Sequence, residues 1–155
     1  MGARRATVLR ITAVPERGGK MNNQEKKAYL RRYRESELEI NRLQDELIRC
    51  RALATRITPT ISDTPGGHGG DRLQAAVDKI AEIESQIDAE IGVWKQLRSD
   101  ILDTISKVED YRLRNILSSR YIRGDKWEQI ALDMHYDYRH ITRLHGKALT
   151  ALQIE

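Results

Sequence analysis

Two long stretches with a seven-residue repeat of apolar side chains constrain the fold of this chain most strongly. In residues 23–57 the repeat consists of Tyr33, Ile40, Leu47 and Ala54, each followed three residues later by Ser36, Leu43, Cys50 and Ile57. In residues 72–107 it consists of Leu73, Ile80, Ile87, Trp94 and Ile101, with Val77, Ile83, Ile91, Leu97 and Ile105 beside them. This spacing predicts two long amphipathic helices.

Residues 58–71 separate the two stretches and contain two prolines and four glycines. Such a composition predicts a loop. Because neither long helix can bury its apolar stripe alone, we expect both to pack as an antiparallel, coiled-coil-like hairpin over residues 23–107. The stripe formed by Ile80, Ile83, Ile87 and Ile91 is wider than one partner helix needs, which favours a homodimer through the hairpin.

The composition favours an all-α fold and a chain that does not enter a membrane. Hydrophobic residues make up 39% of the chain and charged residues 32%, with three prolines and no Phe. Such values are typical of helices with narrow apolar stripes. No apolar run approaches the length of a membrane span. The single cysteine, Cys50, excludes an intrachain disulfide and favours a reducing cytoplasm.

Residues 1–22 show no sustained period and include a Gly18-Gly19-Lys20 break. We therefore expect a disordered N-terminal extension. Met21 opens an ordinary protein start, so translation from Met1 and translation from Met21 both stay open. Basic residues strongly outnumber acidic ones before residue 35, whereas the two nearly balance from residue 109 to the end. The positive charge of the C-terminal part is therefore local to particular helices.

Residues 108–153 predict a small domain of three short helices. The first is expected over residues 111–123, with Leu113, Ile116 and Leu117 inward and Tyr111 and Tyr121 as packing residues, and Gly124 is expected to end it. For the second, Asp125 is the expected N-cap, with Glu128 completing a capping box. Its inward face would carry Trp127, Ile130, Ala131 and Met134.

A third helix, 138–149, follows a short break at His135-Tyr136, and Asp137 is its expected N-cap. Ile141, Leu144, Ala148 and Leu152 would face inward. Two capped helices with a short break between them predict a helix-turn-helix whose second helix can lie in the major groove of DNA.

The outward face of residues 138–149 predicts the contacts with double-stranded DNA. Arg139 and Arg143 are the candidates for bidentate contact with guanine. Tyr138, His140 and Thr142 are candidates for contact with base edges, thymine methyl groups or phosphate. Lys147, Lys126 and Arg123 are the candidate backbone anchors, which position a protein on DNA without specifying sequence.

Other kinds of site find no support in the sequence. His135, His140 and His145 recur every five residues, a spacing that turns successive side chains away from one another on a helix and does not favour zinc. No nucleophile, base and acid occur in a catalytic pattern, so we expect no enzyme activity, no cofactor and no metal.

Residues 25–153 also resemble a known family, most strongly in the C-terminal third. Arg120-Tyr121, Gly124, Trp127-Glu128-Gln129-Ile130-Ala131 and His145-Gly146-Lys147-Ala148-Leu149 are similar to the helix-turn-helix of sigma-factor region four. They are closer to small phage regulators of the RinA-like and ArpU-like group, which the stretch Ala54-Thr55-Arg56-Ile57-Thr58-Pro59 also resembles. The resemblance implies a sequence-specific regulator of late or packaging genes in a phage or prophage.

Two other functions stay open at this point. A small-terminase-like component of DNA packaging also joins a helix-turn-helix to helical assembly segments, and a ring-shaped oligomer would favour it. A helical interaction module that does not bind DNA is the other alternative. For a regulator, the expected partners are double-stranded DNA, a second copy of the chain and host RNA polymerase, in the cytoplasm of a bacterium.

Overall fold

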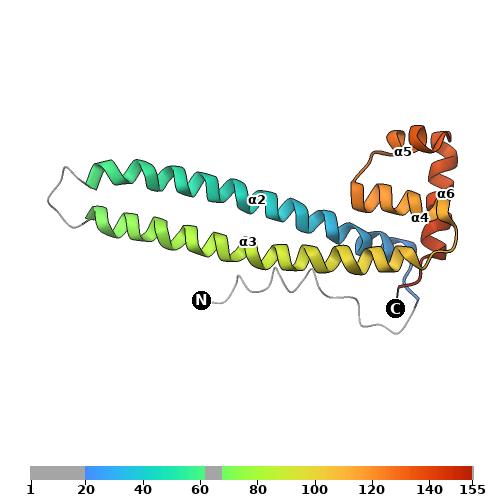
Figure 1. Cartoon of the computed structure of the whole chain (residues 1–155), viewed down its shortest axis with the longest axis horizontal. Helices are drawn as coiled ribbons and strands as arrows, with labels where there is room; N and C mark the ends of the chain where they lie inside the picture. Colours follow the sequence, from blue (N-terminus) through green and yellow to red (C-terminus); the bar gives the residue numbers. More distant parts are fainter. Residues whose placement is uncertain (1–19, 62–67, 155) are drawn as a thin grey trace. The chain divides into compact units, whose positions relative to one another are not determined.

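The computed structural model describes residues 20–61 and 68–154, which form helices and no strand. The helices follow in the order α2 (Asn23–Ile61), α3 (His68–Ser106), α4 (Tyr111–Leu117), the π-helical turn η1 (Ser118–Arg123), α5 (Trp127–Met134) and α6 (Tyr138–Ala151) (Figure 1). The predicted all-α fold is confirmed. Of the predicted N-terminal extension, residues 1–19 lie outside the described part.

Helix α2 begins where the sequence predicts it, because Asn22 and Glu25 cap its first turn. The Asn22 side-chain oxygen accepts hydrogen bonds from the backbone N–H groups of Gln24 at 2.9 Å and Glu25 at 3.0 Å. In return, the Glu25 carboxylate accepts one from the Asn22 N–H at 2.7 Å. This reciprocal pairing satisfies N–H groups that a helix start leaves without a backbone partner.

The predicted loop at residues 58–71 is too long, since both helices extend into it. Helix α2 continues to Ile61, two residues beyond Pro59, and α3 already begins at His68. The missing N–H of one proline removes a single backbone hydrogen bond near the end of a helix. Gly69 and Gly70 lie in the first turn of α3, where N–H groups need no partner within the helix.

The chain forms two compact units. Unit 1 contains the described residues up to Glu35 and those from Leu97 onward, and unit 2 is Ser36–Gln96. The N-terminal part of α2 and the C-terminal part of α3 therefore belong with the short helices, within what the sequence predicted as one hairpin over residues 23–107. No helix in residues 20–61 or 68–154 has both the length and the apolar character of a membrane span.

Unit 1 builds its core from six helical segments, namely parts of α2 and α3 together with α4, η1, α5 and α6. Helix α6 packs against α4 and α5, and η1 packs against α4 and α5. Fully buried side chains come from the short helices, among them Ile116, Ile130 and Ile141, and from the long ones, among them Leu30 and Ile101. A three-helix domain of this size has too little buried area by itself. The long helices therefore complete its core.

Unit 2 is an antiparallel pair formed by parts of α2 and α3. Leu43, Ile83 and Ile87 are buried together, with Leu47, Cys50 and Ile91 packed against them. The broad isoleucine stripe of α3 is thus largely covered by α2 of the same chain. Val77, expected in that stripe, is 48% exposed. Leu73, Ala76 and Ile80 are half-buried at helical spacing and turn Val77 outward.

A buried polar pair interrupts the apolar contacts in unit 2. Ser36 is fully buried and Glu90 is 5% exposed, and the Ser36 hydroxyl donates a 2.7 Å hydrogen bond to a carboxylate oxygen of Glu90. The sequence marked Ser36 as the polar member of the α2 repeat but gave no sign of its partner. Because a shifted register would separate the two groups, this pair favours one alignment of α2 with α3.

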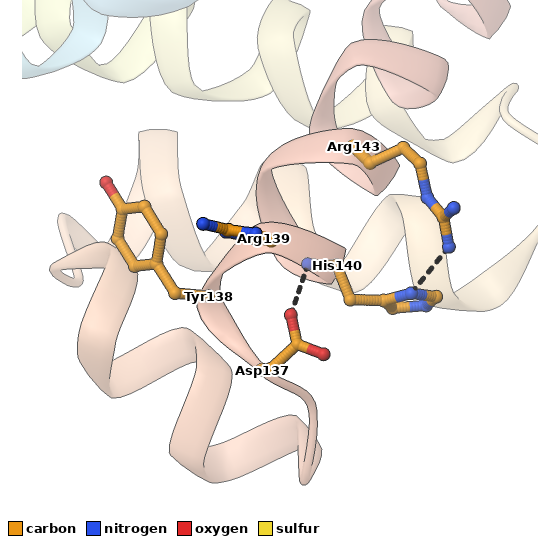
Figure 2. Close-up of a pocket in the computed structure, with 5 residues that line it drawn as sticks. All are labelled: Asp137, Tyr138, Arg139, His140 and Arg143. Atoms are coloured by element: carbon orange, nitrogen blue, oxygen red, sulfur yellow. Dashed lines mark hydrogen bonds between the residues drawn. The ribbon is translucent and has the colours of Figure 1, made fainter.

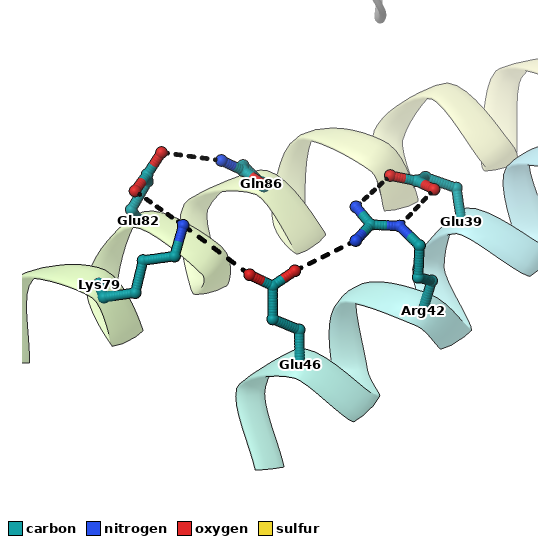
Figure 3. Close-up of polar contacts among 6 residues, drawn as sticks. All are labelled: Glu39, Arg42, Glu46, Lys79, Glu82 and Gln86. Carbon is teal, nitrogen blue, oxygen red and sulfur yellow. Dashed lines mark hydrogen bonds and ion pairs between the residues drawn. The ribbon is translucent and has the colours of Figure 1, made fainter. Parts of the chain in front are cut away.

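Exposed ion pairs lie on α2 and between α2 and α3 in unit 2 (Figure 3). Arg42 contacts Glu39 at 2.7 Å and Glu46 at 3.1 Å, within α2. Lys79 of α3 lies 3.8 Å from Glu46 and so joins the two helices. Exposed pairs of this kind contribute about 0–1 kcal/mol each. The apolar seam and the Ser36–Glu90 hydrogen bond therefore dominate the pairing.

We predict that Ser36→Ala destabilises the protein by about 1–3 kcal/mol, because it leaves the Glu90 carboxylate buried without its hydrogen-bond donor. The double substitution Ser36→Ala with Glu90→Met removes both polar groups and should recover most of that loss. Urea denaturation followed by circular dichroism measures both changes. Arg42→Ala, which removes the two exposed pairs within α2, is the control and should cost less than about 1 kcal/mol, since such pairs within a helix contribute about 0.3–0.5 kcal/mol each. A loss for Ser36→Ala no larger than the control would contradict the prediction.

Candidate nucleic-acid interface

A three-residue turn joins α5 to α6. His135 adopts the left-handed conformation, with φ 56° and ψ 40°, and its N–H donates to the carbonyl oxygens of Ala131 and Leu132. The Tyr136 N–H also donates to the Ala131 carbonyl, at 3.0 Å. Asp137 then caps α6, since its carboxylate accepts a 2.7 Å hydrogen bond from the His140 N–H. The predicted N-cap at Asp137 is confirmed. Histidine adopts a positive φ here although glycine does so more readily.

The predicted N-cap of α5 is wrong. Lys126 occupies that position without a side-chain hydrogen bond, and α5 begins at Trp127. The Asp125 carboxylate instead accepts a 2.8 Å hydrogen bond from Nε of Arg123. In the sequence, Asp125 stands where its carboxylate could cap α5. The sequence does not show that the Arg123 guanidinium competes with the backbone N–H groups for that carboxylate.

The helix before Gly124 ends in a π-helical turn that the sequence did not predict. Gly124 has φ 78°, and its N–H and that of Asp125 both donate to the Ser119 carbonyl oxygen. A Cβ atom on Gly124 would lie 2.7 Å from the guanidinium carbon of Arg34. The expectation that Gly124 ends the helix is confirmed, and its positive φ favours glycine there, whereas the end of the flexible Arg34 side chain could move aside.

Helix α6 separates an apolar face from a polar one, as the sequence predicts. Its inward residues are all buried and comprise Ile141, Leu144, Ala148, Leu149 and Leu152. From Tyr138 to Ala148 its exposed residues are Tyr138, Arg139, Thr142, Arg143 and Lys147, and Thr150 and Ala151 are exposed at its end. At the other end of α6, the Lys26 ammonium donates to the carbonyl oxygens of Leu149 at 2.7 Å and Leu152 at 2.6 Å. A cation at this helix end is favoured by the helix dipole and the unpaired carbonyls.

Four of the predicted site residues lie together around an open hollow of about 540 Å³ at the start of α6 (Figure 2). They are Tyr138, Arg139, His140 and Arg143, and Asp137 completes the lining. Arg143 donates a 2.8 Å hydrogen bond to Nδ1 of His140, which requires the neutral ring to carry its proton on Nε2. The His140 ring lies 4.6 Å from the Tyr136 ring, centroid to centroid. These contacts hold the Arg143 guanidinium beside the hollow.

The remaining predicted residues do not line this hollow. Thr142 is exposed, and its hydroxyl donates to the Arg139 carbonyl at 2.9 Å. Lys147 and Lys126 are exposed on α6 and at the start of α5. Arg123 pairs with Asp125 and donates a 2.5 Å hydrogen bond to the Ser119 hydroxyl. Its charge is therefore partly neutralised, which weakens its case as a backbone anchor.

Two aromatic expectations have opposite outcomes. Tyr121 is 5% exposed, as predicted for a packing residue, whereas Tyr111 is 69% exposed and the prediction for it is wrong. Tyr111 is the first residue of α4, where the three apolar positions that follow, Leu113, Ile116 and Leu117, set the inward face. A side chain at the first position then lies off that face.

The buried histidine of unit 1 was not recognised from the sequence. His145 is 7% exposed, lies 3.0 Å from the Tyr121 hydroxyl through Nε2, and packs 4.7 Å from the Trp127 ring. Burial, followed by the charges of Lys27, Arg120 and Arg31, lowers the pKa of His145 to about 4. Its position four residues after Ile141 and three before Ala148 places it in the inward stripe, so spacing could have revealed it.

No family model, curated protein or solved structure matches this chain. Within residues 20–61 and 68–154, no three His, Cys, Asp or Glu side chains are grouped to hold a metal ion. Inference of a function for this protein therefore rests on the geometry of α6 and its neighbours.

We predict that acid destabilises unit 1 through His145. The unfolded side chain takes up a proton at about pH 6.5 and the folded one at about 4, so stability present above pH 6.5 is lost as pH falls toward 4. The loss at the acid limit is at most roughly 3 kcal/mol. Urea denaturation at pH 7 and pH 4.5 should show a smaller difference in His145→Gln than in the wild type. His140→Gln is the control and should match the wild type; equal acid sensitivity of all three would contradict the prediction.

Proposed function

We propose that this protein is a sequence-specific DNA-binding regulator of transcription and that α6 enters the major groove. One observation carries the proposal: α6 buries one face against α4 and α5 and presents Tyr138, Arg139, Thr142, Arg143 and Lys147 on the other. The three-residue turn after α5 gives the pair the connection of a helix-turn-helix. In such motifs the N-terminal residues of the second helix contact base edges.

The chemistry of the exposed face supports this use of α6. Two guanidinium groups, on Arg139 and Arg143, lie within the first two turns, and α6 itself contains no acidic residue. Guanidinium matches the two acceptors of guanine in the major groove. The nearby Asp137 carboxylate accepts the His140 N–H as the helix cap, which gives it a structural purpose at this position. The Arg143–His140 hydrogen bond holds one guanidinium before DNA is bound.

The resemblance to phage regulators extends the proposal to late or packaging genes of a phage or prophage, in the cytoplasm of its bacterial host. Host RNA polymerase is the partner that such a regulator would recruit or obstruct.

Helix-turn-helix proteins commonly read two half-sites as dimers. In unit 2, Leu53 is 55% exposed and lines a mostly apolar hollow of about 340 Å³. The other lining residues are Cys50, Ile57, Ala75 and Ala76, with Arg72 and Lys79. We place the contact with a second copy at this hollow, and sedimentation of wild type and Leu53→Glu tests it: the variant should be monomeric.

A selection from random duplexes followed by fluorescence anisotropy tests DNA reading. One sequence should be enriched, and Arg143→Ala or Arg139→Ala should weaken its binding by roughly 5- to 150-fold, since a bidentate guanine contact is worth about 1–3 kcal/mol. Both variants should also bind altered sites with less discrimination. Lys147→Ala should weaken binding to all sequences alike and lower the salt dependence.

Arg56→Ala supplies the matched control, because Arg56 is an exposed arginine of unit 2. It removes the same charge without touching α6 and should leave sequence preference unchanged. The proposal fails if no sequence is enriched, or if Arg143→Ala and Arg139→Ala bind every site as Arg56→Ala does.

A further inference from the structure

A second hollow of unit 1, about 330 Å³ in volume, lies beside α6. Residues of four helical segments line it: Lys27 and Arg31 of α2, Arg120 and Tyr121 of η1, Trp127 of α5, and Thr142 and His145 of α6. It shares no lining residue with the hollow around Arg143. The predicted site included Thr142 but none of the cations found here.

The charges around this hollow have one sign. Lys27, Arg31 and Arg120 line it, and no Asp or Glu does. Within the described part of the chain, Lys27 and Arg31 make no ion pair. Arg120 donates one N–H to the Asp125 carbonyl at 2.9 Å and lies 4.7 Å from the Trp127 ring centroid, and its other N–H groups stay available.

The neighbours of the three cations leave their charge uncompensated. The buried His145 is neutral at physiological pH, because burial and the same three cations lower its pKa to about 4. Its Nε2 atom is occupied by the Tyr121 hydroxyl at 3.0 Å. A concave, partly buried surface of one sign concentrates the field and attracts an ion of opposite charge. Two guanidinium groups and an ammonium are the donors that proteins use for phosphate.

We propose that Lys27, Arg31 and Arg120 form a binding site for a phosphate group. The group has two chemical sources, a backbone phosphate of DNA and a free phosphate-bearing solute. The first source rests on the proposed function, whereas the second does not. In either case a residue of α2, outside the helix-turn-helix, contributes to ligand binding, and the occupied site joins α2 to η1 beside α6.

The imidazole signals of His145 in the NMR spectrum of the full chain provide the readout, and their absence in His145→Gln assigns them. Inorganic phosphate is titrated at pH 7.5 against sodium chloride of equal ionic strength, and a DNA duplex is titrated separately. We expect a saturable shift of the His145 signals with phosphate, with the duplex, or with both. A bound anion should also raise the pKa of His145, because it offsets the three neighbouring cations.

Variants localise the effect. Arg31→Gln and Lys27→Gln should each weaken the response at least 10-fold, whereas Arg56→Gln, with the same loss of charge on the exposed surface of unit 2, should keep it. Circular dichroism verifies that each variant is folded. A response to phosphate in the wild type identifies a free phosphate site, and a response to the duplex only identifies a backbone contact.

The inference is overturned if neither probe shifts the His145 signals of the wild type, or if Arg31→Gln and Lys27→Gln respond as the wild type does. Failure of the proposed function has a different signature. In that case the binding of duplexes shows no sequence preference and does not depend on Arg139 or Arg143. The response of the His145 signals to phosphate still depends on Lys27 and Arg31.

Discussion

The position of α6 depends on the burial of one of its faces against α4 and α5. Ile141, Ala148, Leu149 and Leu152 have almost no exposed surface. Each large apolar side chain buried in this way contributes about 1.5–3 kcal/mol. The same burial fixes which residues point outward, since a rotation of the helix that exposed Ile141 would withdraw Arg139 or Arg143. The two ends of α6 are held separately, by Asp137 at the start and Lys26 at the end.

The attachment of Lys26 to α6 shows that the N-terminal part of α2 belongs to unit 1 as much as the short helices do. Leu30 adds to the buried side chains of that unit, and the guanidinium of Arg34 lies over Gly124. Lys27 and Arg31, on the same stretch of α2, bring positive charge to η1 and His145. A ligand that binds these cations would therefore act on the helix that carries Arg139 and Arg143.

Unit 2 illustrates how far a repeat predicts structure. The spacing of Ile40, Leu43, Ile83 and Ile87 sufficed to predict burial, because a helix turns by a constant angle per residue and apolar surface is driven from water. It did not predict the outward turn of Val77. Nor did it pair Ser36 with Glu90, because a carboxylate in a charged sequence looks solvent-exposed until a partner helix covers it. The apolar surface of α3 that was expected to remain for a second copy is largely covered by α2 of the same chain.

The sequence by itself determined the helices, the inward and outward faces of α6, the cap at Asp137 and the end at Gly124. These features depend on residues within a few positions of one another, and local backbone geometry is the same wherever a helix lies. Only the tertiary structure decided that the Asp125 carboxylate binds Arg123 and does not cap α5, and which histidine is buried. It also decided that Lys27 and Arg31 line one hollow with Arg120. These contacts join residues of different helical segments or depend on competition between partners, and no periodic pattern encodes the distance between two such side chains.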